Sequence, residues 1–234
     1  MSTAVITGAS RGLGSALAQA LAARGWTLIV DARDAVALEA AAARLPSGAR
    51  ITWIPGDVAD PSHRRELAAA VRAAGGLDLL VNNASTLGPS PRPTLDRYPL
   101  NELERVYRVN VLAPLALTQE LLSELTAAGG AIVNVTSDAA VEPYQGWGGY
   151  GSSKAALEQL TRVLAEEQPG LRVYIFDPGD MRTAMQQEAF PGEDISDRPE
   201  PETVVPALLR LIESRSPSGR YRAADLDAPA EGAA

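Results

Sequence analysis

Ala4-Val-Ile-Thr-Gly-Ala-Ser-Arg-Gly-Leu-Gly14 joins a short apolar run to a glycine-rich turn. The apolar run predicts a buried strand, and the residues after the turn predict a helix to about Arg24. Glycines at such a turn let the backbone approach a pyrophosphate, whose charge the amide N–H groups of a helix N-terminus stabilise. The spacing Gly8-x-x-x-Gly12-x-Gly14 differs from the G-x-G-x-x-G fingerprint, so a purely structural turn is the alternative. Its position between strand and helix favours a nucleotide site.

Strand and helix patterns alternate along the rest of the chain, which is typical of a parallel sheet covered on both faces. Further strands are expected at 27–30, 50–54, 77–81, 131–136, 172–176 and 219–222. Two helices are expected to end near residues 45 and 75, and three more to cover about 101–126, 150–164 and 202–213. The helix at 101–126 should bend at Pro114. We therefore predict an α/β fold: one doubly wound Rossmann-type domain over residues 1–224, with a seven-stranded parallel sheet. A substrate loop is expected at about 180–200, and the tail 225–234 is expected not to pack.

Composition limits the classes of function. The 234 residues are 46% hydrophobic, enough for one sizeable core, and include no cysteine, which excludes disulfides and thiolate metal sites. A net charge of −8 argues against nucleic-acid binding, which needs a basic surface. The absence of a signal sequence or a long apolar run predicts a soluble cytoplasmic protein that does not enter membranes.

A second pattern carries proton-transfer chemistry. Tyr150-Gly-Ser-Ser-Lys154 places a phenol and an ammonium on one face of an expected helix. Ser137 follows the strand at 131–136, where its hydroxyl should face both groups. A cation near a phenol lowers the phenol's pKa from about 10 towards the working pH. Alone, this spacing is more often an amphipathic helix with a surface lysine, and the other motifs decide against that interpretation.

The motifs together carry a resemblance. Thr7-Gly8-x-x-x-Gly12-x-Gly14, Asp57-Val58, Asn82-Asn83-Ala84, Asn110, Ser137, Tyr150-x-x-x-Lys154 and Pro178-Gly179 follow in that order. In this the chain resembles the short-chain dehydrogenase/reductase family from its first strand to its last. Ser85 departs from the family's usual glycine, although a small residue there should still admit a cofactor. The short segment after Pro178, with Asp180 and Arg182, also departs from the family's pattern, so the resemblance does not identify the substrate.

The resemblance implies four catalytic residues. Tyr150 would be the general acid that protonates a carbonyl oxygen as hydride arrives, and the base in the reverse direction. Lys154 would hold the nicotinamide ribose and lower the Tyr150 pKa. Ser137 would hydrogen-bond the substrate oxygen, and Asn110 would hold a water that relays protons to solvent. A kinked helix with a satisfied amide is the alternative for Asn110.

The resemblance also implies a cofactor site at the carboxyl ends of the strands. Thr183 should reach the nicotinamide carboxamide with its hydroxyl, and the alternative is that it caps a turn of a lid. Asp57 and Val58 should meet the adenine, and Asn82 and Ala84 the adenosine side. The full set expected to bind cofactor is Gly8, Ser10, Arg11, Gly12, Leu13, Gly14, Arg33, Asp57, Val58, Asn82, Ala84, Tyr150, Lys154, Pro178, Gly179 and Thr183.

The end of the second strand should discriminate NADP from NAD. Asp31, about twenty residues after the glycines, could accept from ribose hydroxyls as in NAD sites. Alignment on the family, however, puts Ala32 at the position of that acid. Arg33 and Arg11 fall where basic residues meet the extra phosphate, and guanidinium groups suit a dianion. The sequence favours NADP(H), with NAD(H) as the alternative.

The substrate site is less defined by sequence. Tyr144, Trp147 and Met181, with Ser137, are expected to contact substrate, and Leu87, Ala139 and Met185 should add apolar surface suited to an uncharged carbonyl compound. The same side chains would also serve as lid packing. His63, the only histidine, is expected to be solvated, and no metal site is predicted.

Three classes of function follow. The favoured one is an NADP-dependent oxidoreductase, specifically a carbonyl reductase acting on a small-molecule carbonyl or alcohol. A non-enzymatic nucleotide sensor and a cofactor-retaining isomerase or dehydratase are the alternatives. In the resembled family, the helices after Asn101 and Tyr150 pair across a two-fold axis, and both carry surplus leucine and alanine here. A homodimer or homotetramer is therefore expected, unless that surface packs on the chain's own sheet.

Overall fold

One parallel sheet of seven strands organises residues 2–227, the part of the chain that the computed structural model describes. The strand order is β3-β2-β1-β4-β5-β6-β7. This confirms the predicted doubly wound sheet, and its order reverses between β1 and β4, where ligands bind in such folds. The strands are β1 (Thr3–Ile6), β2 (Thr27–Ala32), β3 (Arg50–Pro55), β4 (Leu79–Asn82), β5 (Ala131–Val135), β6 (Arg172–Asp177) and β7 (Gly219–Arg222).

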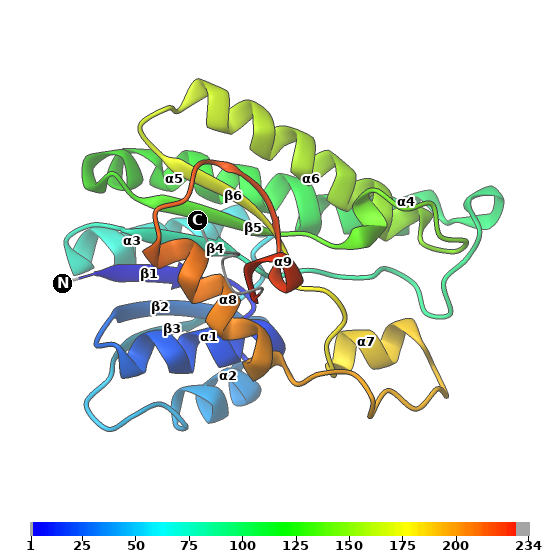
Figure 1. The fold of residues 1–234 in the computed structure, drawn as a ribbon, viewed down its shortest axis with the longest axis horizontal. Helices are drawn as coiled ribbons and strands as arrows, with labels where there is room; N and C mark the ends of the chain where they lie inside the picture. The colour runs from blue at the N-terminus through cyan, green and yellow to red at the C-terminus, as the bar shows by residue number, and fades with distance from the viewer. Residues whose placement is uncertain (1, 228–234) are drawn as a thin grey trace, which may run out of the picture.

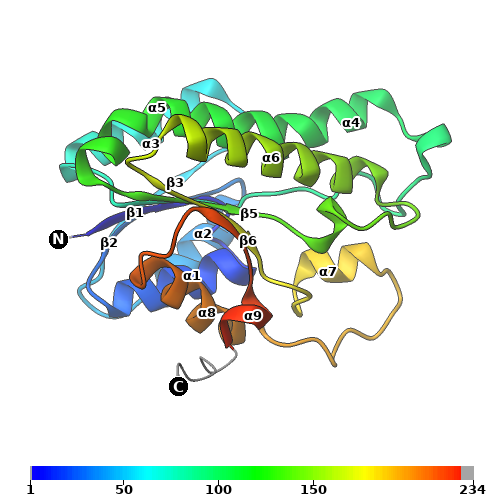
Figure 2. The ribbon, with the colours of Figure 1, turned by 45° about the horizontal axis from the view of Figure 1, so that its top comes forward.

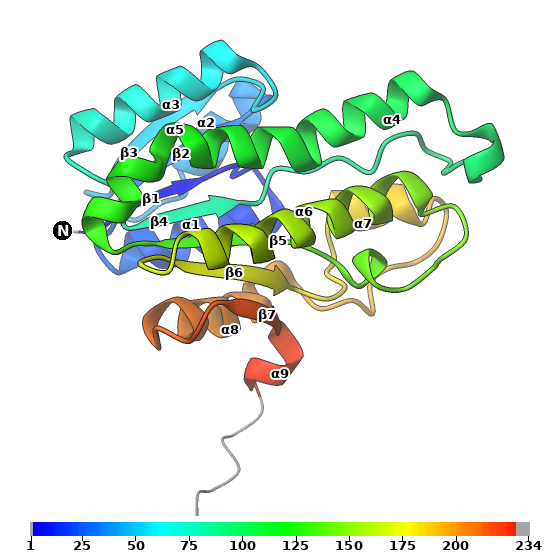
Figure 3. The same cartoon turned by 90° about the horizontal axis from the view of Figure 1, so that it is seen from above.

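Helices cover both faces of the sheet (Figures 1 and 2). Figure 3 shows the helices of one face lying side by side, and these are α3 (Pro61–Ala74), α4 (Leu100–Tyr107), α5 (Ala113–Ala128) and α6 (Gly148–Glu167). The other face carries α1 (Gly12–Ala23), α2 (Ala35–Ala42) and α8 (Pro201–Glu213). The remaining helices are α7 (Ala184–Ala189), α9 (Ala223–Asp227) and short 3₁₀ turns at Leu95–Arg97 and Asp138–Ala140.

Two apolar clusters fill the layers, because alternate strand residues point to opposite faces. Ile6 belongs to the cluster under α1 and α8, together with Leu17 and Leu208. Its neighbour Val5 belongs to the cluster under α3 and α5, together with Leu67. The β1 strand is therefore buried on both sides and fixes the position of the turn that follows it.

The helix that should bend at Pro114 is interrupted just before that residue. Arg108–Leu112 forms a π turn between α4 and α5, and Pro114 lies in the first turn of α5. Proline has no amide N–H, so it cannot donate to the carbonyl of Asn110 as an α-helix requires. The helix widens at that point, which turns Asn110 inward.

The chain beyond β7 corrects one expectation. The tail was expected to be unpacked from residue 225, but α9 continues to Asp227 and Leu226 packs against the main core. Residues 228–234 lie outside the described part of the chain. Among residues 2–227, no helix combines the length and the apolar character needed to span a bilayer.

Candidate active site

A cavity of about 910 Å³ opens at the carboxyl ends of the strands, as expected for this sheet. Residues that directly follow β1 to β6 line it. It brings together most of the predicted site: Gly8, Ser10, Arg11, Gly12, Leu13, Arg33, Asp57, Val58, Ala84, Ser137, Tyr144, Trp147, Tyr150, Lys154, Pro178, Gly179, Met181 and Thr183. Leu87, Ala139 and Met185 border it too. Gly14, Asn82 and Asn110 do not, and each has another role.

The glycine turn is built for close backbone approach. Gly8 has a φ of 68°, and a Cβ there would lie 2.9 Å from the Cα of Ala84. A Cβ at Gly14 would lie 2.6 Å from the Gly8 carbonyl oxygen, so this glycine lets α1 pack against the turn. No side chain caps the N-terminus of α1, and its first turn holds no acid. The amide N–H groups of that turn are therefore free to face an anion.

Asn83, to which the sequence assigned no role, borders the cavity where Asn82 was expected. The β4 strand includes Asn82, whose buried amide donates to Asn134 Oδ1 at 2.8 Å, away from the cavity. The expectation that Asn82 lines the adenosine side is therefore wrong. Asn83 borders the cavity instead, and its Nδ2 donates to the Thr7 and Gly8 carbonyls at 2.8 and 3.1 Å. Because neighbouring strand residues face opposite ways, a one-residue error in the expected end of the strand placed Asn82 at the cavity instead of Asn83.

Tyr150, Lys154 and Ser137 lie together at the cavity. Tyr150 and Lys154 leave one face of α6, and the Lys154 Nζ lies 5.5 Å from the centre of the Tyr150 ring. The ammonium is buried and donates to the Val135 carbonyl at 2.8 Å. Ser137 Oγ accepts from the Ala139 amide and donates to Asp138 Oδ1 at 2.8 Å. Asp138 was not predicted, and only its place beside Ser137 could have pointed to it.

Burial sets the ionisation of this group. It raises the pKa of the Tyr150 phenol, the charges of Asp177 and Asp138 raise it further, and hydrogen bonds with Ser85 and Ser137 oppose them. Burial also lowers the pKa of Lys154 to about 8. The net effect is a raised Tyr150 pKa, so the expected lowering by Lys154 does not describe this arrangement. A phenol whose pKa is raised stays protonated at neutral pH and is able to donate a proton.

Asn110 fixes the wall of the cavity from behind. Its Oδ1 accepts from the Thr86 amide at 2.9 Å and the Ser85 hydroxyl at 3.2 Å. Its Nδ2 donates to the Thr86 carbonyl at 2.9 Å and to Ser153 Oγ at 3.0 Å. Both ends of the amide are thus engaged, which agrees with the alternative of a satisfied amide at a helix irregularity. Ser85 was expected only to admit a cofactor, yet its hydroxyl bonds both Asn110 and Tyr150.

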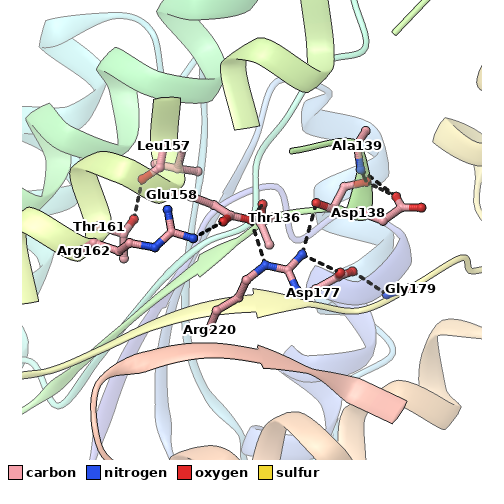
Figure 4. A network of polar contacts seen from close by, with 11 residues as sticks. Thr136, Asp138, Ala139, Leu157, Glu158, Thr161, Arg162, Asp177, Gly179 and Arg220 are labelled. Atoms are coloured by element: carbon pink, nitrogen blue, oxygen red, sulfur yellow. Dashed lines mark hydrogen bonds and ion pairs between the residues drawn. The ribbon is translucent and has the colours of Figure 1, made fainter. Parts of the chain in front are cut away.

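A buried ion network ties the catalytic elements together (Figure 4). Arg220 on β7 donates to Glu158 Oε1 at 3.1 Å and to Asp177 Oδ2 at 2.9 Å. Glu158 lies one turn after Lys154 on α6, and Asp177 accepts from the Gly179 amide at 3.0 Å. Arg220 therefore links the helix that carries Tyr150 to the loop beside the cavity, a role that the sequence did not suggest.

Two guanidinium groups lie at the rim of the cavity beside the glycine turn, among acidic side chains that also border it. Arg11 and Arg33 are exposed, border the cavity and make no side-chain ion pair within residues 2–227. Asp31 borders the cavity too, but it is buried, with Oδ1 accepting from the Gly8 amide at 2.8 Å. Its Oδ2 lies 3.0 Å from Nε2 of His63. His63 is buried, which contradicts the expectation that it is solvated, because α3 turns it towards the sheet.

Aromatic and sulfur-containing side chains form the opposite wall. Trp147 stacks edge-on against Tyr150 with ring centres 5.8 Å apart, and Phe190 packs on Trp147 at 6.0 Å. The Tyr144 hydroxyl donates to Asp138 Oδ2 at 3.0 Å. Thr183 borders the cavity, and its Oγ1 caps α7 by accepting from the Gln186 amide, which agrees with the alternative of a cap. Phe190 was missed because its contact with Trp147 spans forty-three positions.

Metal-binding side chains do not cluster in the described part of the chain, where no group of three or more His, Cys, Asp or Glu could hold an ion.

The family model for short chain dehydrogenase matches residues 2–194, which include the glycine turn, Ser137 and the Tyr150–Lys154 pair. The chain belongs to the short-chain dehydrogenase family. This family membership makes it an oxidoreductase, and it confirms the resemblance that the motifs carried.

Relatives within the family extend over most of the chain. Sepiapterin reductase of Xenopus tropicalis is 34% identical over 232 residues, covering 92% of this chain and 84% of that protein. An alcohol dehydrogenase from the archaeon Thermococcus sibiricus, complexed with 5-hydroxy-NADP, is similar with a TM-score of 0.85, 29% identity and 95% of each chain covered. A short chain dehydrogenase from Shigella flexneri, complexed with NADP, gives a TM-score of 0.89 at 30% identity over 95% of this chain and 97% of its own.

Proposed function

We propose that the protein is an NADP(H)-dependent oxidoreductase that transfers hydride between the nicotinamide and a carbonyl or secondary alcohol. The observation that carries this proposal is the meeting of Tyr150, Lys154 and Ser137 in one cavity with the glycine turn. A turn suited to a nucleotide and a group suited to proton transfer, set in one cavity, suit a reaction that moves a hydride and a proton together. The cofactor would supply or accept the hydride.

The protein's own groups would manage the proton and the developing charge. Tyr150, whose raised pKa keeps it protonated, donates to the carbonyl oxygen as negative charge forms there. Ser137 turns its hydroxyl from Asp138 to the same oxygen and stabilises that charge. Lys154, with a pKa of about 8, returns a proton to the phenol and holds the ribose. The main-chain carbonyl of Asn110, which receives no α-helical hydrogen bond because Pro114 has no amide N–H, would hold the water that relays protons to solvent.

The cofactor assignment rests on local charge. The uncapped α1 N-terminus and the Gly8 turn suit a pyrophosphate. The guanidinium groups of Arg11 and Arg33, which make no ion pair with residues 2–227, suit a 2′-phosphate. Asp31, the residue that an NAD site would use, has both oxygens engaged. Two solved relatives hold NADP or 5-hydroxy-NADP, which supports the same preference.

The substrate would be an uncharged carbonyl compound with apolar surface. Trp147, Met181 and Met185 line the cavity beside Tyr150, with Leu87 completing an apolar wall. The relative named a reductase supports the carbonyl direction. We also propose a homo-oligomer, because Leu112 and Val163 remain exposed on the helices that the family uses for assembly.

The test is turnover. Purified protein is mixed with 4-deuterated NADPH and a panel of aromatic and aliphatic ketones and aldehydes, and product deuterium is measured by mass spectrometry. The proposal expects label in the alcohol carbon of at least one product. Tight NADPH binding without any label transfer would contradict it and favour the nucleotide sensor.

A further inference from the structure

Asp31 and His63 form a buried pair behind the cofactor end of the cavity. Asp31 belongs to β2 and His63 to α3, and the exposed fractions of the two residues are 2% and 4%. One oxygen of Asp31 holds the Gly8 amide at 2.8 Å, and the other lies 3.0 Å from His63 Nε2. The backbone of Gly56 packs against the imidazole of His63. The Nδ1 atom of that ring is buried and has no hydrogen-bond partner among residues 2–227. Asp31 is therefore the one hydrogen-bond partner of the His63 ring within residues 2–227.

The location of the acid gives this pair its significance. Asp31 borders the same cavity as Arg11 and Arg33. Although Ala32 stands where the family keeps its ribose-binding acid, a free Asp31 carboxylate one residue earlier could accept from the 2′-hydroxyl of an NAD ribose, and its charge opposes a phosphate there. Here Asp31 supports the Gly8 amide of the pyrophosphate turn instead, and an imidazole faces its other oxygen.

We propose that His63 is a specificity-determining residue: it occupies the second oxygen of Asp31, offsets its charge, and so favours NADP(H) over NAD(H). This role rests on the NADP(H) preference proposed above, and it assigns part of that preference to His63, which does not border the cavity. His63 acts through Asp31, so it is a positioning residue rather than a catalytic one.

Charge makes the effect depend on pH. The hydrogen bond to Asp31 raises the His63 pKa, burial opposes it, and the charges of Asp31, Glu66 and Asp57 reinforce it. The carboxylate of Asp60, at the start of α3, also interacts with the His63 ring through its charge. A raised pKa means that the protonated pair is complete below the unfolded value of about 6.5 and is lost as pH rises through the folded value. The NADP(H) preference should weaken over that range.

A double-mutant cycle on cofactor affinity tests the proposal. Dissociation constants for NADPH and NADH are measured by fluorescence titration in the wild type, His63→Leu, Asp31→Asn and the double variant, with thermal melts to establish folding. We expect His63→Leu to reduce the NADPH-to-NADH affinity ratio about tenfold in the wild-type background, and less than about twofold beside Asp31→Asn. Equal losses for both cofactors, in both backgrounds, would overturn the inference and leave His63 a packing residue.

A conservative variant and the free protein supply independent readouts. His63→Gln keeps a donor for Asp31 but no charge, so its affinity ratio should match the wild type only above the folded pKa of His63. Because His63 is the only histidine, its ring signal in proton NMR is unambiguous, and its pKa should fall in Asp31→Asn. A wild type that prefers NADH would overturn the cofactor assignment and the inference together. NADPH preference without coupling, or a His63 pKa unchanged by Asp31→Asn, would overturn the inference alone.

Discussion

Arg220 Nη2 donates to Asp177 Oδ2 at 2.9 Å and so places a guanidinium against one of the charges that raise the Tyr150 pKa. The same side chain holds Glu158 on α6 at 3.1 Å. Arg220 lies on β7, the last strand of the sheet, so the C-terminal part of the fold bears on the ionisation of Tyr150.

Replacing Arg220 should therefore change a pH profile and not only stability. In Arg220→Lys, loss of the forked contact leaves Asp177 less compensated, so the pKa of Tyr150 should rise and alcohol oxidation should need more alkaline pH. Arg162→Lys is the matched control, because Arg162 contacts Glu158 from the partly exposed side and does not reach Asp177. Rate profiles against pH that coincide for both variants and the wild type would refute this role.

Arg33→Ala should weaken NADPH binding by roughly 1.5–3 kcal/mol, the scale of a hydrogen bond between charged groups, and leave NADH nearly unchanged. Arg44→Ala is the control for the change in net charge, because Arg44 is also exposed but does not border the cavity. Calorimetric titration of both cofactors measures the difference. Equal losses for the two cofactors would show that Arg33 does not meet the phosphate.

Lys154 is the only lysine in the chain, so its pKa can be read directly. In protein labelled with ¹³Cε-lysine, the single side-chain resonance should titrate near the value of about 8 that burial imposes. A midpoint near 10.5, as for a solvated lysine, would contradict the buried position.

The same shift predicts how stability depends on pH. The unfolded chain holds the Lys154 proton up to about 10.4, while the folded chain loses it near 8, so wild-type stability should rise through that window. Relative to Lys154→Met, the wild type should gain about 2 kcal/mol between pH 7 and pH 10. Urea unfolding of both proteins at the two pH values measures this gain, and parallel behaviour would contradict it.

Assembly should depend on a small surface. Leu117 and Leu121 pack on the chain's own sheet, whereas Leu112 is 55% exposed on the outer side of the same helical segment. Leu112→Glu should release monomers, because a carboxylate cannot be buried unpaired at an interface. Val36→Glu, at an exposed site on α2, is the control. Light scattering of a wild-type monomer at micromolar concentration would rule out the assembly.

Sequence patterns predicted the features that depend on residues close together in the chain. The Tyr150–Lys154 pair needs only one helix face, and the Asp60 cap of α3 and the left-handed Gly75 at its end are set by neighbouring residues. Relationships across the sheet were not accessible in this way. The Asp31–His63 pair joins two elements whose packing no spacing reveals, and the choice between Asn82 and Asn83 depends on where a strand ends to within one residue.

Tyr150→Phe tests the central claim most directly. The substitution removes one hydroxyl and little contact area, so NADPH affinity should stay within about twofold of the wild type while carbonyl reduction falls by roughly 10²–10⁴, the usual contribution of general acid catalysis. Tyr221→Phe, whose hydroxyl bonds the Pro217 carbonyl away from the cavity, should keep wild-type activity. The decisive measurement is single-turnover oxidation of bound NADPH by a carbonyl substrate in the three proteins. Loss of turnover in Tyr150→Phe alone, with the cofactor still bound, is the predicted result, and a Tyr150→Phe enzyme that retains most of its rate would contradict the account.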